Sequence, residues 1–157
     1  MRILVVCLGN ICRSPTAEAA LCEALGDAGL AGTVQVASAG TGDWHLGEPP
    51  DPRMTAAASS MGLRLDGTSC LITQRDFATA DLILVMDRSN LRDVSALAPD
   101  DAARAKIRLF REFDPDADSD EVPDPYYGGD EAFRTVVEIV RRAARGVVKY
   151  VRERMGE

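Results

Sequence analysis

The sequence predicts a single α/β domain, built on a four-stranded parallel sheet with helices on both faces. Short apolar, β-branched segments alternate along the chain with segments of helical periodicity, and this alternation is typical of a parallel sheet. The length of 157 residues and the hydrophobic fraction of 46% suit one domain with a substantial core. The sequence has no internal repeat, linker or break in composition, so we expect residues 1–157 to form one domain.

Four segments have the pattern of strands, because they are short, rich in apolar residues and bounded by turn residues. They cover residues 3–6, 33–38, 80–86 and 107–110. The second alternates between apolar and polar residues, whereas the first and third are almost continuously apolar. Ligands of such sheets bind beyond the carboxyl ends of the strands. The loops that follow the strands are therefore where a site is expected.

Helical segments separate the strands, and most of them carry start and stop signals. They cover residues 15–28, residues 51–61, a segment opened by residues 87–89, and residues 130–154. Gly29 and Gly62 end the first two. The last helix has an apolar stripe at helical spacing, which predicts that one face packs on the sheet. The stripe consists of Phe133, Val136, Val137, Val140, Ala144, Val147, Val148 and Val151.

The loop after the first strand is the most informative part of the chain, and it runs from Cys7 to Ser14. Gly9 and Asn10 tolerate the positive φ of a tightly curled loop. Backbone N–H groups in such a loop, with the N-terminus of the next helix, can converge on one anion. Arg13 adds a planar, two-pronged donor for phosphate, and cationic surroundings stabilise Cys7 as a thiolate. The segment predicts a phosphate-binding loop with a nucleophilic cysteine.

A buried cysteine beside an ordinary Gly-Asn turn is the alternative interpretation of this segment. A cysteine and an arginine six residues apart form a weak pattern by themselves. The context favours the phosphate-binding loop, because Ser14 is a good N-cap and Pro15 suits the first position of a helix. The strand, the loop and the start of the helix then all indicate a phosphate-binding loop.

The segment 114–127 is irregular and acidic. Its aspartates have some of the spacing of a calcium loop, but Ser119 and Pro125 occupy the positions of the required glycine and glutamate. Most of these carboxylates are therefore expected to be a solvated charge run. Asp124 differs, because it lies between two prolines and precedes two tyrosines. Held above the phosphate, it could protonate a departing oxygen, while an ordinary turn aspartate is the alternative.

Composition excludes several other classes of function. The net charge of −7 argues against a nucleic-acid partner. No apolar segment is long enough to span a bilayer or has the form of a secretory signal, so we expect a cytoplasmic protein without a membrane partner. Four cysteines and a single histidine, His45, form neither a disulfide framework nor a metal site. Basic residues of the last helix are expected on a solvated face: Arg141, Arg145, Lys149 and Arg152.

Together these segments resemble the low-molecular-weight protein tyrosine phosphatases, especially bacterial members of actinobacterial type. The resemblance covers essentially the whole chain from Arg2 onward, and its motifs are specific. They are residues 6–15 (VCLGNICRSP) with Ala17 and Glu18, residues 38–41 (SAGT), Trp44 and His45 before Pro49 and Asp51, Met86 and Asp87 with Ser89 and Asn90, and residues 124–128 (DPYYG). The family implies a four-stranded parallel sheet with helices on both faces.

The resemblance also implies a role for each residue of the site. Cys7 is the implied nucleophile, Arg13 the phosphate clamp, and Asp124 the general acid that later activates water. The other implied residues bind the substrate or steady the loop: Leu8, Gly9, Asn10, Ile11, Cys12 and Ser14, with Trp44, Tyr126 and Tyr127 as walls of an aromatic slot. Many relatives have a histidine and an arginine where this chain has Gly67 and Cys70. Because that histidine often braces the loop asparagine, the bracing of Asn10 is expected to differ.

The implied activity is hydrolysis of phosphotyrosine in proteins through a cysteinyl-phosphate, without a metal or an organic cofactor. Its partners would be tyrosine-phosphorylated proteins, with inorganic phosphate as product and inhibitor, and we expect a monomer. An arsenate reductase of similar fold is one alternative, but it needs further downstream cysteines and only Cys70 is present. A phosphotyrosine-binding module is another, but it would normally lack either Cys7 or Asp124.

Cys12 is a second cysteine in the same loop, five residues after Cys7. A thiolate is the species that peroxide oxidises, and a nearby thiol can trap the sulfenic acid as a disulfide. Many members of the family carry this pair. We therefore predict Cys12 to be the redox partner of Cys7, the alternative being a small residue that fills the loop.

Overall fold

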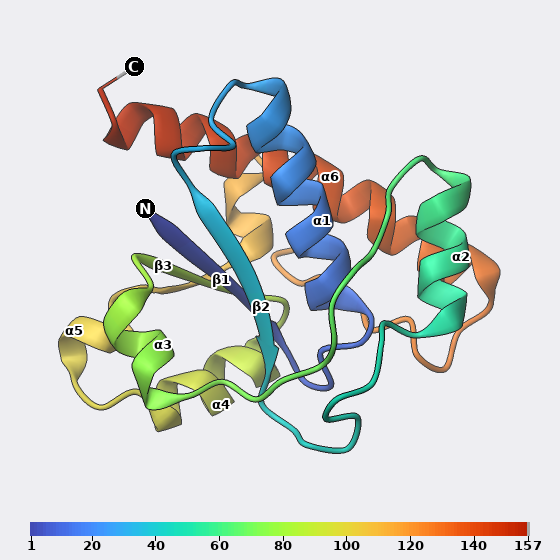
Figure 1. Ribbon diagram of the computed structural model, residues 1–157, viewed down its shortest axis with the longest axis horizontal. Coiled ribbons are helices and arrows are strands. Elements are labelled where there is room, and N and C mark those ends of the chain that lie inside the picture. The colour runs from blue at the N-terminus through green and yellow to red at the C-terminus, as the bar shows by residue number, and fades with distance from the viewer. Residues whose placement is uncertain (157) are drawn as a thin grey trace.

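Four short strands form one sheet in the order β2-β1-β3-β4, and every neighbouring pair is parallel. The computed structural model describes residues 1–156 (Figure 1). Its strands are β1 (Arg2–Cys7), β2 (Gln35–Gly40), β3 (Leu82–Val85) and β4 (Ile107–Leu109). The central strands β1 and β3 are almost wholly buried, as their apolar sequences predict.

Helices cover both faces of the sheet, which confirms the predicted fold class. In Figure 1, α1, α2 and α6 lie on one face, and α3, α4 and α5 lie on the other. The helices are α1 (Arg13–Asp27), α2 (Pro52–Ser60), α3 (Gln74–Thr79), α4 (Arg88–Leu97), α5 (Asp101–Arg104) and α6 (Asp130–Arg154), with a 3₁₀ helix, η1 (Phe110–Phe113), after β4.

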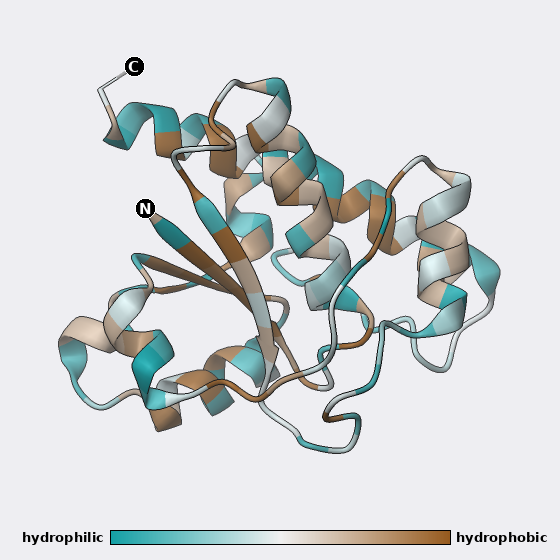
Figure 2. Cartoon of the chain, in the orientation of Figure 1, coloured by the Kyte–Doolittle hydropathy of each residue, from teal (hydrophilic) through white to brown (hydrophobic). Residues whose placement is uncertain are grey.

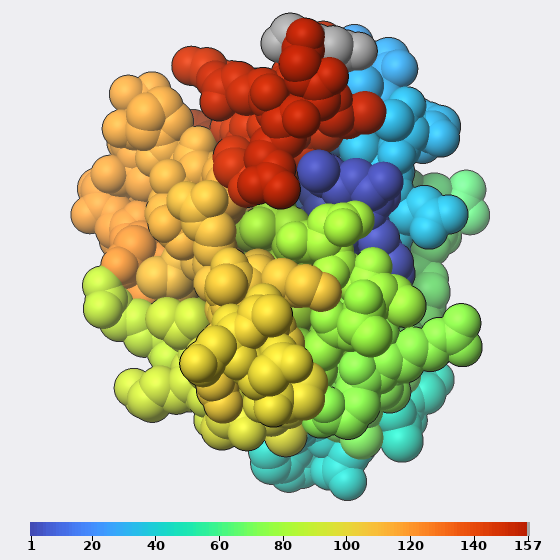
Figure 3. Space-filling view, turned by 90° about the vertical axis from the view of Figure 1, so that its left-hand side faces the viewer, coloured from blue at the N-terminus to red at the C-terminus, as the bar shows by residue number. Residues whose placement is uncertain are grey.

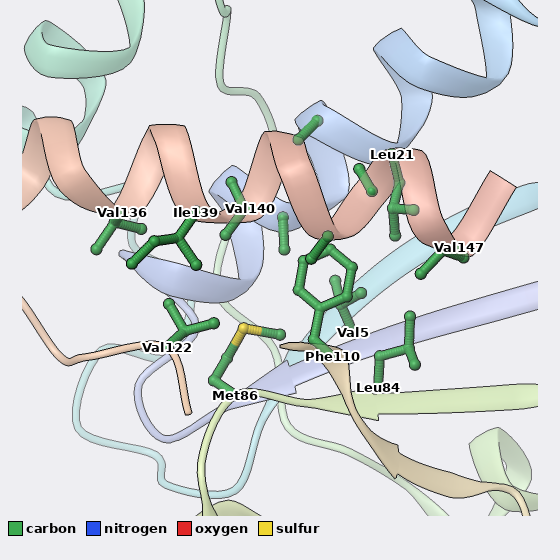
Figure 4. Close-up of a cluster of buried hydrophobic side chains, with 14 of the residues drawn as sticks. Val5, Leu21, Leu84, Met86, Phe110, Val122, Val136, Ile139, Val140 and Val147 are labelled. Carbon is green, nitrogen blue, oxygen red and sulfur yellow. The ribbon is translucent and has the colours of Figure 1, made fainter. Parts of the chain in front are cut away.

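Alternate side chains of β1 enter two different hydrophobic cores. Ile3 and Val5 belong to the larger core with α1 and α6, whereas Leu4 and Val6 belong to the smaller core with α3 and α4. The central strands β1 and β3 are mostly hydrophobic, whereas β2 is mixed and the helices alternate between hydrophilic and hydrophobic segments (Figure 2). Figure 4 shows the larger core, where Val140 and Val147 of α6 face Val5 and Leu84 of the sheet.

The two ends of the sheet differ in what they carry. The first residues of the chain lie beside the end of α6 at the amino ends of the strands (Figure 3). The loops after β1 and β2 and the segment after η1 lie at the other end, where the strands finish. This is the end at which open α/β sheets bind ligands.

Several predicted boundaries were displaced. Helix α1 begins at Arg13, so the N-cap is Cys12 and not Ser14, and Pro15 is the third helical residue. The side chain of Ser14 instead turns toward Cys7, as described below. The second strand starts and ends two residues later than expected, at Gln35–Gly40. Asp51 and Asp87 cap their helices as predicted, and α6 has the predicted bounds.

The sequence interpretation missed α3 and α5, which are only six and four residues long. It was also wrong about one residue of the basic face. Both Arg141 nitrogens Nε and Nη2 donate to Glu23 at 3.0 Å, and Nη1 donates to the Met61 carbonyl, so Arg141 joins α6 to α1 and α2. No helix within the described residues is long and apolar enough to cross a membrane.

Candidate active site

A cavity of about 480 Å³ opens where the loop after β1 meets two other loops. One is the segment 41–50 after β2, and the other is the segment 114–129 between η1 and α6, here called the acid loop. The cavity brings together residues predicted from distant parts of the sequence. Its lining consists of Cys7, Leu8, Gly9, Ile11, Cys12, Arg13, Trp44, His45, Asp124, Tyr126 and Tyr127.

Several carbonyl groups of the backbone from Leu8 to Cys12, here called the phosphate loop, accept hydrogen bonds from the surrounding protein. Gly42 N donates to the Leu8 carbonyl at 2.9 Å, and Asp51 N donates to the Ile11 carbonyl at 2.8 Å. The Gly9 carbonyl accepts from Ser69 Oγ at 2.9 Å. These contacts fix the curled backbone of the loop, the kind of arrangement in which successive N–H groups can converge on an anion.

Cys7 lies at the bottom of this loop and is only 3% exposed. Its Sγ is 3.0 Å from Ser14 Oγ, and it accepts the backbone N–H of Asn10 at 3.3 Å. Ser14 Oγ accepts from Asn10 Nδ2 at 2.7 Å, and its own proton can be given to the sulfur. When Cys7 acts as a thiolate it has no proton to give, so both of these groups can then donate to Sγ.

Asn10 holds the turn and lies behind the cavity. It has a φ of 55°, which asparagine tolerates better than most residues. Its Nδ2 also donates to Ser38 Oγ at 3.0 Å, and its Oδ1 accepts the backbone N–H of Cys70 at 3.0 Å. The sequence predicted altered bracing here, and this chain supplies it from the Cys70 main chain. Ser38 and Ser69 were not predicted as site residues: Ser38 was noted only as part of the motif of residues 38–41, and Ser69 belongs to no motif.

Gly40 closes the end of β2 against the phosphate loop. A Cβ atom on Gly40 would lie 2.7 Å from the Leu8 carbonyl oxygen and 3.1 Å from Asn10 Cβ. The residue must therefore be glycine for the two backbones to approach this closely.

Arg13 follows the phosphate loop as the first residue of α1 and is 4% exposed. Its Nη1 donates to Asp87 Oδ2 at 2.6 Å and to the Val122 carbonyl at 2.9 Å, and its Nη2 lies 3.8 Å from Asp124 Oδ2. Burial opposes its charge, but Cys7, Asp87 and Asp124 outweigh burial and hold the pKa of Arg13 above its usual value. Asp87, predicted only as a helix cap, also orients this guanidinium.

The two cysteines of the loop have different surroundings. Cys12 is 5% exposed, and burial with the negative charges of Asp51 and Cys7 raises its pKa to about 12. Cys12 is therefore a neutral thiol near pH 7. No disulfide joins it to Cys7 in this structure, and both are free thiols.

The outer walls of the cavity are aromatic and far more exposed. Trp44 is 70% exposed and Tyr127 is 96% exposed. Tyr126 has more contacts with the rest of the protein than these two residues have. Arg53 Nη1 donates to its carbonyl at 2.9 Å, and the Arg53 guanidinium lies 5.1 Å from its ring. The ring of His45 lies 6.0 Å from that of Tyr126, so His45 joins the wall although it was not predicted as a site residue.

Asp124 enters the cavity from the acid loop with its side chain 49% exposed. Its Oδ1 accepts the backbone N–H of Tyr126 at 3.0 Å. Cysteine, guanidinium and carboxylate thus line one cavity together with residues of the phosphate loop. Such a set is suited to transfer of a phosphoryl group from an aryl ester to a cysteine.

Comparison with known proteins places the chain in a family. Residues 2–156 match the model of the low molecular weight phosphotyrosine protein phosphatases. A low molecular weight protein-tyrosine-phosphatase of Streptomyces coelicolor is 44% identical, over 98% of this chain and 95% of the relative. The low molecular weight protein-tyrosine phosphatase A of Mycobacterium bovis is 35% identical, over 99% and 94%. The chain belongs to this family.

Solved structures agree with that assignment. A protein tyrosine phosphatase of Entamoeba histolytica, crystallised with Hepes in its active site, superposes with a TM-score of 0.95. It is 35% identical, and the match covers 99% of each chain. The predicted family and fold are therefore confirmed.

Proposed function

We propose that Cys7, Arg13 and Asp124 carry out the hydrolysis of phosphotyrosine in proteins through a cysteinyl-phosphate intermediate. One observation carries the assignment. The buried sulfur of Cys7 lies at the floor of the cavity with two donors directed at it, and the cavity is also lined by the Arg13 guanidinium and the Asp124 carboxyl group. Family membership supplies the reaction class, and these contacts support the proposed roles.

In the first step the Cys7 thiolate attacks phosphorus in line with the bond to the tyrosyl oxygen. An S–P bond forms, the P–O bond breaks, and protonated Asp124 gives its proton to the departing phenolate. A phenol has a pKa of about 10 and leaves poorly as an anion at neutral pH, so this proton transfer matters. The phosphate-loop N–H groups and Arg13 stabilise the three equatorial oxygens.

In the second step Asp124, now a carboxylate, removes a proton from a water molecule that attacks the cysteinyl-phosphate. The S–P bond breaks, the thiolate of Cys7 is restored, and inorganic phosphate leaves. Ser14 Oγ and the Asn10 N–H stabilise the leaving thiolate, because both donate to Sγ. A covalent intermediate of this kind predicts ping-pong kinetics.

The aromatic wall supports an aryl phosphate as the substrate. The side chains of Trp44, Tyr126 and Tyr127 flank the mouth of the cavity and offer stacking and apolar burial to a phenyl ring. A serine phosphate would leave these faces unused. We accordingly propose tyrosine-phosphorylated proteins as substrates, inorganic phosphate as a product that also inhibits, and a cytoplasmic monomer as the working form.

The test is to replace Cys7 and measure turnover and phosphate binding separately. Cys7→Ser is expected to fold and bind inorganic phosphate, but to lose turnover of p-nitrophenyl phosphate and of phosphotyrosine peptides, because a neutral hydroxyl cannot replace the thiolate. Cys22→Ser, which changes an exposed cysteine on α1, is the matched control and should keep full activity. Activity of Cys7→Ser within tenfold of the unmodified protein would exclude Cys7 as nucleophile.

The same assay with arsenate separates the alternative function. An arsenate reductase would reduce arsenate with a thiol donor and turn over aryl phosphates poorly. We expect the opposite result, because the acid loop presents Asp124 and two tyrosines to an aryl ester.

A further inference from the structure

The acid loop has no regular secondary structure, yet its backbone is fixed just before Asp124. Val122 is fully buried, and its N–H donates to the Met86 carbonyl at 2.8 Å. Figure 4 shows Val122 beside Met86, beneath α6. The Val122 carbonyl accepts from Arg13 Nη1 at 2.9 Å. One anchor of the loop therefore lies two residues before the carboxyl group that enters the cavity.

A second guanidinium, that of Arg111, contacts Glu121, the residue before Val122. Arg111, on η1, is 4% exposed, and its Nη1 donates to the Glu121 carbonyl at 2.9 Å. The carbonyls of Glu121 and Val122 thus accept from two different buried arginines, Arg111 and Arg13. Hydrogen bonds from a charged donor in buried surroundings are stronger than neutral ones in water.

The remaining contacts of Arg111 do not account for its burial. Its Nη2 donates to Asp118 Oδ1 at 2.9 Å, but that carboxylate is 92% exposed, and exposed ion pairs add little stability. Its Nε is buried and has no hydrogen-bond partner within residues 1–156. A buried guanidinium with an unsatisfied nitrogen is unfavourable by itself. The contact of Arg111 nearest to Asp124 is the one to the Glu121 carbonyl, whereas the Glu121 carboxylate is held separately by the Arg88 N–H at 2.9 Å.

We infer that Arg111 is a positioning residue for Asp124. By fixing the Glu121 carbonyl it sets the path of the backbone through Val122 and Pro123, and so the height of the Asp124 carboxyl group above the phosphate loop. Arg111 does not line the cavity, so it acts through the loop and not on the substrate. This inference rests on the proposed role of Asp124 as general acid.

The far side of Asp124 is held by different residues. Its Oδ1 accepts from Tyr126 N, and Arg53 holds the Tyr126 carbonyl. Losing Arg111 would therefore let the loop shift on one side without releasing it completely. Proton transfer requires the acid within about 3 Å of the leaving oxygen, so a shift of this kind weakens acid catalysis selectively.

The experiment compares Arg111→Met with the control Arg108→Met on two substrates with different leaving groups. Arg108 pairs with Glu112 and lies 4.6 Å from the Phe113 ring, so its loss removes the same charge nearby. Arg111→Met should lower kcat about tenfold on phenyl phosphate and about twofold on p-nitrophenyl phosphate, whose leaving group needs less protonation. Inhibition by inorganic phosphate and the control variant's rates should stay unchanged.

A double mutant makes the result specific to Asp124. In an Asp124→Ala background, Arg111→Met should cause no further difference between the two substrates, because the acid that it positions is gone. Arg111→Lys keeps the charge but not the planar guanidinium, so its kcat on phenyl phosphate should lie between those of Arg111→Met and the unmodified protein. It replaces Arg111→Met in the test if that variant does not fold.

The outcomes separate this inference from the proposed function. If Asp124→Ala slows both substrates equally, Asp124 is not the general acid, and that part of the proposed function is wrong. If Asp124→Ala discriminates between the substrates but Arg111→Met and Arg111→Lys slow both equally, or slow neither, only the positioning role of Arg111 is wrong.

Discussion

The phosphate loop and the acid loop serve one reaction but are built in opposite ways. In the phosphate loop Asn10 and Cys12 are 3% and 5% exposed, and several backbone carbonyls are engaged by the surrounding protein. In the acid loop Asp124 is about half exposed, Tyr127 is 96% exposed, and buried guanidinium groups hold only a few points of the backbone. Binding an anion requires fixed dipoles, whereas the acid must meet a substrate that enters and leaves.

This contrast predicts two kinetic signatures. Changes in the phosphate loop should slow the turnover of every phosphate ester by the same factor, because the phosphoryl group is common to all of them. Changes in the acid loop should depend on the leaving group, because only the departing oxygen differs. Each prediction below tests one side of that division.

The largest effect is expected for Arg13→Lys. An ammonium group cannot make the planar two-pronged contact with phosphate or hold both Asp87 and the Val122 carbonyl. We expect kcat to fall about a thousandfold on p-nitrophenyl phosphate and somewhat further on phenyl phosphate, because the Val122 anchor of the acid loop is lost as well. Steady-state kinetics on the two substrates measures this. A fall in kcat on phenyl phosphate alone would show that Arg13 acts through the acid loop, and it would contradict the division between the two loops.

Asp124→Ala should show the opposite signature. Without the acid, phenyl phosphate turnover should fall by about a hundredfold or more, whereas p-nitrophenyl phosphate should be affected much less, since its leaving group is more acidic. Inhibition by inorganic phosphate should change little. The ratio of the two kcat values is the measurement, and an unchanged ratio would show that Asp124 is not the general acid.

A smaller effect is expected for Ser69→Ala. Ser69 is 4% exposed and its hydroxyl donates to the Gly9 carbonyl, so its loss leaves that carbonyl unpaired and loosens the phosphate loop. We expect inorganic phosphate to bind about fivefold more weakly, corresponding to the loss of about 1 kcal/mol from one hydrogen bond. Both substrates should slow in proportion. Thr68→Ala is the neighbouring control, and equal inhibition constants in the two variants would show that the bond has no role.

Cys12→Ser should leave turnover almost unchanged and affect only recovery from oxidation. After peroxide converts Cys7 to a sulfenic acid, the Cys12 thiol is expected to form a Cys7–Cys12 disulfide with release of water, which a thiol reductant then reverses. The raised pKa of Cys12, about 12, leaves it neutral and so unreactive toward peroxide itself. Peptide mapping after mild oxidation detects the disulfide. Full recovery of Cys12→Ser with dithiothreitol would show that Cys12 gives no protection.

The same contrast explains what the sequence could predict. The phosphate loop lies within one run of consecutive residues, Val6 to Pro15. The strand, the turn residues and the helix start within this segment all indicate the same structure, so the function of the loop could be predicted from the sequence. The apolar stripe of α6 and the caps Asp51 and Asp87 were readable for the same reason. Ser14 was misassigned as an N-cap, because a hydroxyl suits both a helix start and a thiolate, and only the fold brings Cys7 within 3.0 Å.

What could not be predicted depends on contacts between distant segments. Ser38, Ser69 and the Cys70 N–H reach the phosphate loop from 28 to 60 residues away. Ser38 belongs to the motif of residues 38–41, but its contact with Asn10 is not visible in the sequence, and Ser69 and Cys70 belong to no motif. Arg111 likewise looks like any surface arginine until η1 places it under the acid loop. The short helices α3 and α5 contain too few residues to show a helical period.

The most direct test of the account is to identify the atom that carries phosphate during turnover. The enzyme is mixed with p-nitrophenyl phosphate, quenched in acid within the first turnovers, and examined by intact-mass measurement and peptide mapping. We predict one phosphoryl group on the peptide that contains Cys7, absent from Cys7→Ser and still formed in Asp124→Ala. Phosphate on another residue, or turnover that shows no phosphoenzyme at any quench time, would contradict the proposed mechanism.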